Sequence, residues 1–399
     1  MRFGVNYTPR VGWFHSWLDL DPALVAEDMA AIRSLGADHV RIFPLWPLLQ
    51  PNRTLIRPAA VDDVLRVVDL AGEAGLTVTV DALQGHLSSF DFLPSWVTTW
   101  HEKNLFTDAG TVSGEESLVR TLARELSSRP NADGLSVGNE FIQFGADRHP
   151  GQSRLTADEA AAWLTRLIGA AREEWPGAQL THSFDDDLWF DDGHPFQPVH
   201  AGTFGDVTTV HSWVFMQVGP RYGQGHSALT LFARYLVELA RAWSAPDRPI
   251  WLQEVGAPST HVPAEDVPAF VSETIGHLTG LDGRPAAKGL EAITWWCSHD
   301  VSRELADFPE LEHSLGLIGS DGKVKPGGEA FAQTVRAARQ AEAARAALTI
   351  AGPDPTVPAL VLPTRDPARR SDAGPRSEFF DRWVSLAQEG PAPGLVLPR

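Results

Sequence analysis

Two glutamates that each follow a short apolar segment are the strongest candidates for chemistry in this sequence. Glu140 ends the run LSVGNE, and Glu254 ends the run IWLQE. Two facing carboxyl groups can share a reaction, because one donates a proton while the other attacks as an anion. A glutamate chosen at random is a solvated surface charge. Since both of these residues come directly after buried-strand patterns, we expect both to be catalytic.

Other polar and aromatic side chains end or follow strand-like segments in the same way. The candidate binding residues are Arg41, His86, Asn139, His211, Trp213, Trp295 and Trp296. A structural role is the alternative for each, since a buried ion pair or a hydrogen-bonded core histidine is common in proteins. Adjacent strand residues point to opposite sides, so we expect only one of Trp295 and Trp296 to face a site.

The segments that must position these residues alternate as strand, loop and amphipathic helix. The predicted strands are 3–6, 39–43, 76–81, 134–138, 179–183, 207–210, 250–254 and 292–296. Their continuous apolar runs are typical of parallel strands that are buried on both faces. Eight such units predict a (β/α)₈ TIM barrel with enlarged loops at its C-terminal face, where barrel enzymes place their chemistry. A doubly wound sheet is disfavoured, because no glycine-rich phosphate loop follows the first strand.

Helix start signals support the same division of the chain. Asp21 with Pro22 opens one helix, and a capping box from Thr156 to Glu159 opens another. The predicted helices are 22–35, 59–74, 114–128, 157–175, 228–243, 264–279 and 326–345. The segment 184–206 has no clear helical pattern, and we expect irregular structure there.

Residues 1–345 are thus predicted to form the barrel, followed by an extension at 346–399 that is rich in proline and alanine. Within the extension a short helix is expected at 377–388. Its Phe379, Phe380 and Trp383 are expected to dock on the barrel. The oligomeric state is left open.

The charge and the chain start limit the partners and the location. The formal net charge of −18 repels phosphate groups, so neither a nucleic acid nor an anionic membrane surface is an expected partner. No apolar run has the length of a membrane span. The segment MRFGVNYTPR lacks the pattern of a secretory signal, which favours a cytoplasmic protein. The single cysteine, Cys297, excludes an intrachain disulfide and is expected to be a buried small residue.

The acidic segment that follows the fifth predicted strand contains residue types that can bind a metal. The residues concerned are His182, Asp185, Asp186, Asp187, Asp191, Asp192, His194 and His200. Their spacing matches no calcium loop. A solvated acidic loop, or one that contacts sugar hydroxyls, is the preferred interpretation. We therefore expect neither a metal nor an organic cofactor.

The two glutamate motifs resemble those of clan A glycoside hydrolases. The run LSVGNE is similar to the strand-four motif of that clan, whose glutamate is the acid/base and whose asparagine binds the sugar 2-hydroxyl. The run WLQEVG is similar to its strand-seven nucleophile motif. Arg41, His86, His211 and a strand-eight tryptophan fit the further pattern of family 5. The resemblance covers about residues 3–335.

This resemblance implies a retaining mechanism with Glu140 as acid/base and Glu254 as nucleophile. We expect Arg41 to lower the pKa of Glu254 and keep it ionised, whereas Glu140 needs an apolar wall or a negative charge that raises its pKa. One departure affects the nucleophile. Family 5 has His-x-Tyr after strand six, but this chain has His211 followed two residues later by Trp213. An indole N–H can donate a hydrogen bond but not accept one.

Three longer runs resemble a bacterial β-mannosidase branch of family 5. They are FGVNYTPRVGWFHSWLD, HVRIFPLWPLLQPNRT and QGHLSSFDFLPSW. The resemblance implies hydrolysis of short β-mannosides, such as mannose β-1,4-linked to N-acetylglucosamine, from the non-reducing end. The partner is then an oligosaccharide or small glycoside substrate. An endo-β-mannanase or β-glucosidase of the same clan is the alternative enzyme, and a carbohydrate-binding barrel without turnover is the alternative from another class.

Overall fold

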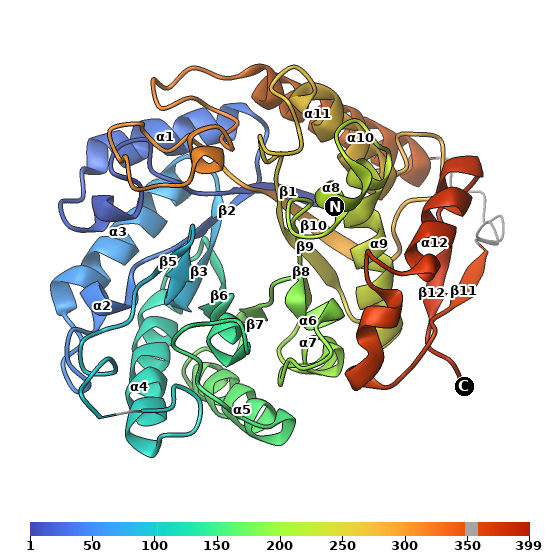
Figure 1. Cartoon of the computed structure of the whole chain (residues 1–399). Coiled ribbons are helices and arrows are strands. Elements are labelled where there is room, and N and C mark those ends of the chain that lie inside the picture. The colour runs from blue at the N-terminus through green and yellow to red at the C-terminus, as the bar shows by residue number, and fades with distance from the viewer. Residues whose placement is uncertain (102, 348–357) are drawn as a thin grey trace.

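Eight parallel strands form the centre of the molecule, in a computed structural model that describes residues 1–101, 103–347 and 358–399 (Figure 1). The strands are β1 (Arg2–Asn6), β2 (His39–Ile42), β3 (Thr77–Leu83), β6 (Ala132–Asn139), β7 (Gln179–Ser183), β8 (Thr208–Ser212), β9 (Ile250–Val255) and β10 (Leu290–Trp295). They pair in the order β7-β6-β3-β2-β1-β10-β9-β8. Successive barrel strands therefore pair with each other, except β7 and β8, and the last strand, β10, pairs with the first, β1. All eight predicted strands are present.

The seam between β7 and β8 completes the barrel through side chains. The backbone N–H of Asp206 donates to the carbonyl of Leu180 at 2.8 Å, and the Asp206 carboxylate accepts from the Leu180 N–H at 2.7 Å. The Thr209 hydroxyl donates to the His182 carbonyl at 2.8 Å and accepts from the Phe184 N–H at 3.2 Å. The strands are thus joined around the ring, and the predicted (β/α)₈ barrel is confirmed.

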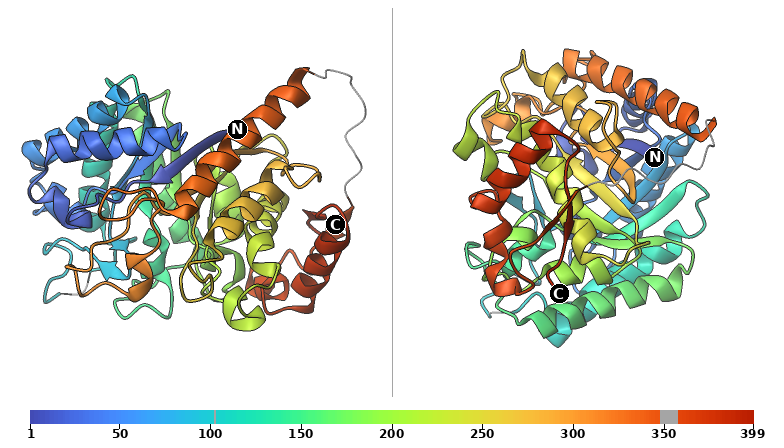
Figure 2. Two further views of the ribbon diagram at one scale, coloured as in Figure 1. Left: turned by 90° about the horizontal axis from the view of Figure 1, so that it is seen from above. Right: turned by 90° about the vertical axis from the view of Figure 1, so that its right-hand side faces the viewer.

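Long helices surround the strands, and the main hydrophobic core lies between the two layers (Figures 1 and 2). They are α1 (Pro22–Ser34), α3 (Pro58–Glu73), α4 (Ala109–Leu126), α5 (Ala157–Glu174), α9 (Ala228–Trp243), α10 (Val267–Thr279) and α11 (Pro326–Ala347). The Asp21 carboxylate accepts from the N–H groups of Ala23 and Leu24, as its capping position predicts. The capping box of Thr156 and Glu159 is also formed. None of the helices in the described residues is long and apolar enough to cross a membrane.

The connection between β7 and β8 differs from the prediction. Irregular structure was expected there, but two short helices form, α6 (Asp187–Phe190) and α7 (Pro198–Thr203). Helices of four and six residues are too short to show a 3.6-residue apolar repeat in the sequence. A proline at the first position of α7 is the local signal that marks its start.

The loops at the C-terminal ends of the strands contain further short elements. They are η1 (Trp13–Trp17) after β1, α2 (Trp46–Leu49) after β2, β4 (His86–Leu87) and β5 (Phe90–Asp91) after β3, η2 (Phe141–Gly145) after β6, α8 (Val218–Tyr222) after β8 and η3 (Glu310–His313) after β10. A second hydrophobic cluster joins several of these loops and includes Trp13, Phe14, Phe43 and Trp296. It gives one end of the barrel a firm apolar support.

The C-terminal segment packs on the outside of the barrel beside α9 (Figures 1 and 2). It contains β11 (Ala359–Val361), η4 (Pro367–Ala373), α12 (Glu378–Glu389) and β12 (Gly394–Val396), and α12 coincides with the predicted helix. Phe380 and Trp383 are fully buried, and both rings contact Tyr235 of α9. Phe379 is partly buried against the same core. Residues 348–357 of the predicted extension lie outside the described residues, and the division at residue 345 stays a prediction.

Candidate active site

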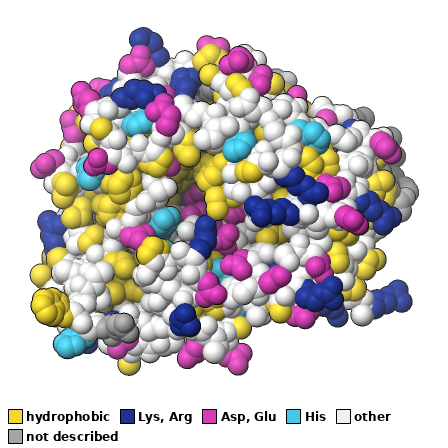
Figure 3. All heavy atoms as spheres, in the orientation of Figure 1, with side chains coloured by type: hydrophobic (Ala, Val, Ile, Leu, Met, Phe, Trp, Pro, Cys, Tyr) yellow, Lys and Arg dark blue, Asp and Glu magenta, His cyan; other side chains and the backbone are white. Residues whose placement is uncertain are grey.

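A cavity of about 320 Å³ lies at the C-terminal ends of the strands. Its size is at the lower end of the range for small-molecule sites, which is about 300–1,000 Å³. Figure 3 shows a hollow near the middle of this face, with acidic side chains at its floor. The predicted site residues that line the cavity are His86, Asn139, Glu140, Trp213, Glu254 and Trp296.

The two glutamates face each other across this cavity. A carboxylate oxygen of Glu140 lies within 4.8 Å of a carboxylate oxygen of Glu254. Their side chains are 14 % and 4 % exposed. A separation of about 5–5.5 Å suits direct attack on a sugar by one of the two groups, whereas an attacking water between them needs about 6.5–9.5 Å. The geometry therefore matches a double-displacement pair.

Backbone strain is concentrated around the cavity. Glu140 has a φ of 43° and ψ of 24°, in the left-handed region that non-glycine residues rarely adopt. Ser88 and Ser89, in the turn between β4 and β5, have φ values of 51° and 69°. Trp13, which packs on Trp296, has a φ of 47°. Such conformations cost about 1–3 kcal/mol each and cluster at functional sites.

Arg41 holds the polar network beneath Glu254. Its guanidinium donates to Glu254 Oε1 at 2.9 Å and to Asp81 Oδ2 at 2.8 Å. It also donates to the side-chain oxygens of Asn6 at 2.9 Å and Asn139 at 2.5 Å. Arg41 is fully buried and does not line the cavity. Its prediction as a substrate-binding residue is therefore corrected, because all of its contacts are to protein groups that it fixes in place.

His211 lies below both catalytic candidates, and the pairing of β8 with β9 sets it opposite Glu254. Its Nδ1 is 2.7 Å from Glu140 Oε1 and 3.4 Å from Glu254 Oε2. Its Nε2 is 3.2 Å from the side-chain oxygen of Gln253. His211 is also fully buried and outside the cavity lining, so its prediction as a substrate-binding residue is corrected in the same way.

Arg41 lowers the pKa of Glu254 as predicted, but the net pKa directions of the two glutamates differ from those expected from the sequence. Burial raises the pKa of Glu140, but the hydrogen bond and charge of His211, together with the charges of His86 and Arg41, lower that pKa by more. Burial raises the pKa of Glu254, and the negative charge of Glu140 raises it further. The positive charges of His211 and Arg41 lower this pKa, but not enough to cancel the rise. Burial lowers the pKa of His211, yet the net direction is upward because both carboxylates stabilise its imidazolium. The 2.7 Å hydrogen bond between His211 and Glu140 therefore favours an imidazolium beside a carboxylate.

Trp213 takes the place in which family 5 has a tyrosine. Its indole N–H donates to Glu254 Oε2 at 3.3 Å, while Arg41 donates to the other oxygen of the same carboxylate. Trp213 also packs edge-on against Trp296, with ring centroids 6.2 Å apart. Although Trp213 replaces the tyrosine of His-x-Tyr, the residue at this position still donates a hydrogen bond to Glu254.

Comparisons with solved structures decide the family. A GH5_18 enzyme from Streptomyces cattleya, in complex with GlcNAc, has a TM-score of 0.91 and 49 % identity over 99 % of this chain and 93 % of that chain. A glutamate-to-alanine variant of GH5_18 from the same organism, in complex with Manβ1-4GlcNAc, has a TM-score of 0.91 and 48 % identity over 99 % and 94 %. A GH5_18 variant from Bifidobacterium longum subsp. longum, in complex with the same disaccharide, has a TM-score of 0.90 and 42 % identity over 100 % and 91 %.

The chain belongs to glycoside hydrolase family 5, subfamily 18. It is a glycoside hydrolase. No protein-family model and no curated protein sequence matches it.

The two adjacent tryptophans of this family 5 chain have different surroundings. Trp296 lines the cavity and rests on Trp13 and Phe43. Trp295 packs between Phe270 of α10 and Phe331 of α11, in the main core. The inclusion of Trp295 among the substrate-binding residues is therefore corrected, since the alternation of a strand sends it to the opposite side.

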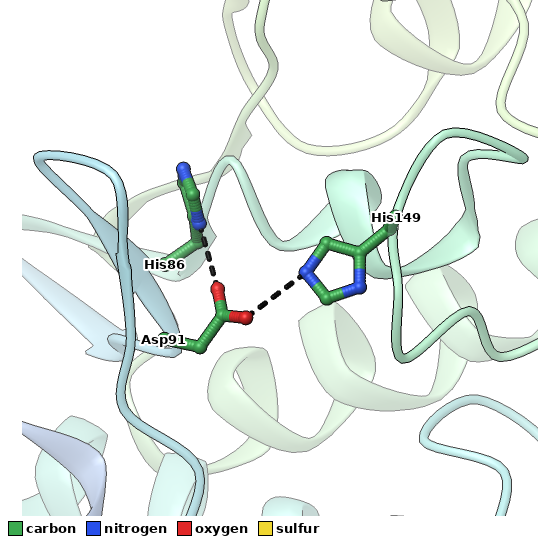
Figure 4. Close-up of side chains that lie close together, drawn as sticks. All are labelled: His86, Asp91 and His149. Carbon is green, nitrogen blue, oxygen red and sulfur yellow. Dashed lines mark hydrogen bonds and ion pairs between the residues drawn. The ribbon is translucent and has the colours of Figure 1, made fainter.

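His86 is held in a second polar cluster at the cavity edge (Figure 4). Its Nδ1 is 2.8 Å from Asp91 Oδ1, and the other oxygen of Asp91 is 3.2 Å from Nε2 of His149. Asp91 thereby ties the β4–β5 hairpin to the loop that follows η2. These three residues have the donor types of a cation site. A carboxylate that bridges two imidazoles accounts equally well for both contacts, and His86 lines the cavity.

The acidic segment after β7 is divided between the cavity and the core. Asp185 and Asp186 line the cavity, where burial and neighbouring acidic charges raise the pKa of each well above its usual value. Asp187 forms an ion pair with Arg148. His182 instead packs against Trp163 and two phenylalanines, and burial lowers its pKa to about 3. Asp185 and Asp186 therefore lie in the cavity, whereas His182 lies in the core away from it.

The cavity residues that were not predicted include four polar ones, Ser88, Gln143, Arg148 and Glu312. Gln143 donates to Glu140 Oε2 at 3.0 Å and accepts from Arg148 at 3.4 Å. Ser88 accepts from the indole N–H of Trp13 at 3.2 Å. All four lie in loops or 3₁₀ turns, where no apolar period places a side chain. The only sequence signal is their position in the long connections that follow predicted strands.

Proposed function

We propose that this family 5 enzyme hydrolyses short β-mannosides from the non-reducing end by double displacement. The observation that carries the proposal is the facing pair, whose carboxylate oxygens lie within 4.8 Å of each other at the floor of a small cavity. Glu254 is the proposed nucleophile, and Glu140 is the proposed acid/base. A covalent glycosyl–enzyme intermediate forms on Glu254, and water then releases the sugar with its original anomeric configuration.

The surroundings of the two carboxyl groups support these roles. Arg41 and Trp213 hold one oxygen each of Glu254, so the carboxylate is fixed for attack. Glu140 accepts a 2.7 Å hydrogen bond from His211. When a bound sugar excludes water, a neutral pair of carboxylic acid and imidazole costs less than an ion pair. The proton then moves to Glu140, which passes it to the glycosidic oxygen, and Glu140 takes a proton from water in the second step.

The other cavity residues are proposed to bind the sugar. Trp296 offers an aromatic face to the apolar side of the reacting sugar. The Asn139 amide is anchored by Arg41 and by the His86 carbonyl, at 3.3 Å from its Nδ2, and lies beside Glu140. It is proposed to bind the 2-hydroxyl. Arg41 and His211 are proposed to act as positioning residues that do not touch substrate.

The relatives suggest the leaving group. Two GH5_18 variants hold Manβ1-4GlcNAc, and GH5_18 from Streptomyces cattleya holds GlcNAc. We carry these ligands over to this chain because it covers at least 91 % of the length of each of these proteins. A cavity of about 320 Å³ also suits a disaccharide better than a polymer. The cytoplasm is the proposed location, which fractionation of the producing cells would test.

Proton NMR of Manβ1-4GlcNAc hydrolysis is the experiment that tests the proposal. We expect mannose to appear first as the β-anomer, together with one equivalent of N-acetylglucosamine. The α-anomer as first product would contradict double displacement. Cellobiose and polymeric mannan serve as comparison substrates. Faster cleavage of cellobiose would indicate a β-glucosidase, internal cleavage of mannan would indicate an endo-enzyme, and binding without cleavage would indicate a carbohydrate-binding barrel.

A further inference from the structure

Glu312 is a buried carboxyl group in the cavity wall that the proposed double displacement does not use. It lies in η3, the turn in the long loop after β10, and is 6 % exposed. It lines the same cavity as the catalytic candidates. In the described residues its Oε2 has no hydrogen-bond partner. A buried carboxyl oxygen without a partner is costly to the fold, so its presence calls for a role outside folding.

The surroundings of Glu312 disfavour its charged form. Burial raises its pKa to about 7, and the Ser88 hydroxyl and the Trp296 indole only partly oppose this rise. No cation of the described residues pairs with it within 4.0 Å. Leu311 and Leu315 of the same loop pack in the second hydrophobic cluster, which includes Trp296. Glu312 therefore provides a hydrogen-bond acceptor in a buried part of the cavity lining, where a hydrogen bond is stronger than in water.

The position of Glu312 relative to the catalytic pair indicates which sugar it faces. Gln143 donates to Glu140, and Arg148 donates to Gln143, so these cavity residues lie around the proposed acid/base. Glu312 instead lies next to Trp296, whose ring is proposed to hold the reacting sugar, and the charge of Glu254 acts on Glu312 more strongly than that of Glu140. A sugar attacked by Glu254 has its ring over this region.

Two features of the opposite loop support a binding role at this point. The turn between β4 and β5 places Ser88 and Ser89 in left-handed conformations, where hairpin turns ordinarily have asparagine or glycine. Ser88 is then fixed by the indole N–H of Trp13 at 3.2 Å. This strained turn brings a hydroxyl next to Glu312 and narrows the cavity at that end. Leu311 completes the lining beside it.

We propose that the Glu312 carboxyl binds hydroxyl groups of the non-reducing terminal sugar and selects for their configuration. A carboxyl group can accept hydrogen bonds from two neighbouring hydroxyls at once, one at each oxygen. An epimer that moves one of these hydroxyls leaves a buried acceptor unpaired, which sites of this kind reject strongly. Glu312 is thus a specificity-determining residue, and this inference rests on the proposed glycosidase function.

The experiment couples a change in the enzyme to a change in the sugar. Aryl β-mannosides that lack the 2-, 3-, 4- or 6-hydroxyl are compared with the parent glycoside on wild type, Glu312→Gln and Glu312→Ala. We expect Glu312→Ala to lower kcat/KM for the parent by about 10- to 100-fold, the effect of losing hydrogen bonds to a charged group. For one or two deoxy substrates, Glu312→Ala should lower kcat/KM much less, because the hydroxyl that Glu312 binds is already missing from the substrate.

The controls separate binding from folding and from the proposed function. Glu310→Gln changes an exposed glutamate of the same turn and should leave every kcat/KM unchanged. Thermal unfolding of Glu312→Gln, which has nearly the same shape, shows whether the fold is kept. Equal losses on all four deoxy substrates and the parent would overturn the inference. If wild type cleaves another aryl glycoside instead of the mannoside, the proposed substrate fails, and the deoxy series of the cleaved sugar then decides the role of Glu312.

Discussion

Glu140 and Glu254 have different cationic partners although they lie side by side. Arg41 binds Glu254 at 2.9 Å, whereas His211 is closer to Glu140, at 2.7 Å, than to Glu254, at 3.4 Å. Arginine keeps its charge at every physiological pH, but histidine gains and loses a proton readily. A nucleophile needs a constant negative charge, and an acid/base must exchange its proton in each cycle. The two partners therefore favour Glu254 as nucleophile and Glu140 as acid/base.

Replacement of the acid/base provides the first prediction. Glu140→Ala should slow Manβ1-4GlcNAc by about 10²–10⁴-fold, because the leaving oxygen loses its proton donor. Activated aryl β-mannosides need little protonation, so their glycosylation should be much less affected. External azide should then raise turnover of the aryl substrate and give a β-mannosyl azide, which is measured by mass spectrometry and NMR.

The matched change at the nucleophile is the control for this prediction. Glu254→Gln should abolish turnover of both substrates, and azide should not restore the β-product. Glu291→Gln, at an exposed position of β10, should behave as wild type. Azide rescue of Glu254→Gln in place of Glu140→Ala would mean that the two roles are exchanged.

Trp213 gives a second prediction at the residue scale. Trp213→Phe removes the indole N–H that lies 3.3 Å from Glu254 Oε2. The loss of a hydrogen bond to a charged group should reduce kcat/KM by roughly 10- to 100-fold. Trp213→Tyr should retain more activity than Trp213→Phe, because a phenol can donate to the same oxygen. The activities of wild type and the two variants are compared with an aryl β-mannoside at saturating and limiting concentrations. Equal activities of the two variants would show that this hydrogen bond does not contribute.

Residues at strand ends were predictable from the sequence, and residues in turns were not. Glu140 and Glu254 were found because an apolar strand fixes where its last side chain lies in a barrel. Arg41 and His211 were also found, but burial below the cavity gives them contacts to protein groups only. Glu312 was missed because the conformation of its loop depends on contacts with distant segments. The net pKa directions of the pair were not predicted for a related reason, since the sequence does not show how deeply Glu254 is buried or that His211 lies 2.7 Å from Glu140.

At the scale of elements, the eight strands and the long helices follow from local patterns. Short helices such as α6 and α7 do not, because four to six residues hold no complete apolar repeat. The seam between β7 and β8 was equally invisible, since it depends on side chains of Asp206 and Thr209 that bridge the two strands. Regular elements are thus predicted by periodicity, whereas the connections that shape the cavity are set by tertiary contacts.

The contact between α4 and α5 carries a prediction on stability. Trp163 of α5 donates to the buried carboxyl of Glu115 in α4 at 2.9 Å, and burial raises the pKa of Glu115 to about 8. The unfolded chain releases this proton near pH 4.5, but the folded protein keeps it up to about pH 8. The free energy of unfolding therefore falls as the pH rises through this window. Glu115→Gln cannot ionise, so it should be more stable than wild type at pH 8 and differ less at pH 5.

Chemical denaturation at the two pH values measures this effect. Glu116→Gln is the matched control, because hydrogen bonds from Arg166 and Arg120 outweigh the desolvation that raises the Glu116 pKa, and the net direction is downward. Its carboxylate contributes stability at high pH, so the substitution should reduce stability at pH 8, which is the opposite sign. Parallel stability curves for wild type and Glu115→Gln between pH 5 and 8 would contradict the role of Glu115.

At the scale of the whole molecule, the C-terminal segment acts as a cover for the barrel. Arg370 donates to the backbone carbonyls of Leu188, His194 and Phe196, in the same connection that carries Asp185 to the cavity. We propose that residues 1–345 form the catalytic barrel and that residues 346–399 form an extension that stabilises it. The extension supports a cavity loop from behind and contributes no cavity residue in the described part of the chain.

Trp383 tests whether this cover is structural. It is fully buried against Tyr235, so Trp383→Ala should lower the free energy of unfolding by about 3–5 kcal/mol. At 25 °C kcat/KM should stay close to that of wild type, because Trp383 does not line the cavity. Trp100→Ala, at a fully exposed tryptophan, controls for the loss of an indole alone. Truncation after Gly352 should likewise lower the unfolding temperature but leave hydrolysis intact in the folded protein. A folded truncated protein without activity would mean that Arg370 is needed to hold the loop after β7, and that the extension belongs to the active site.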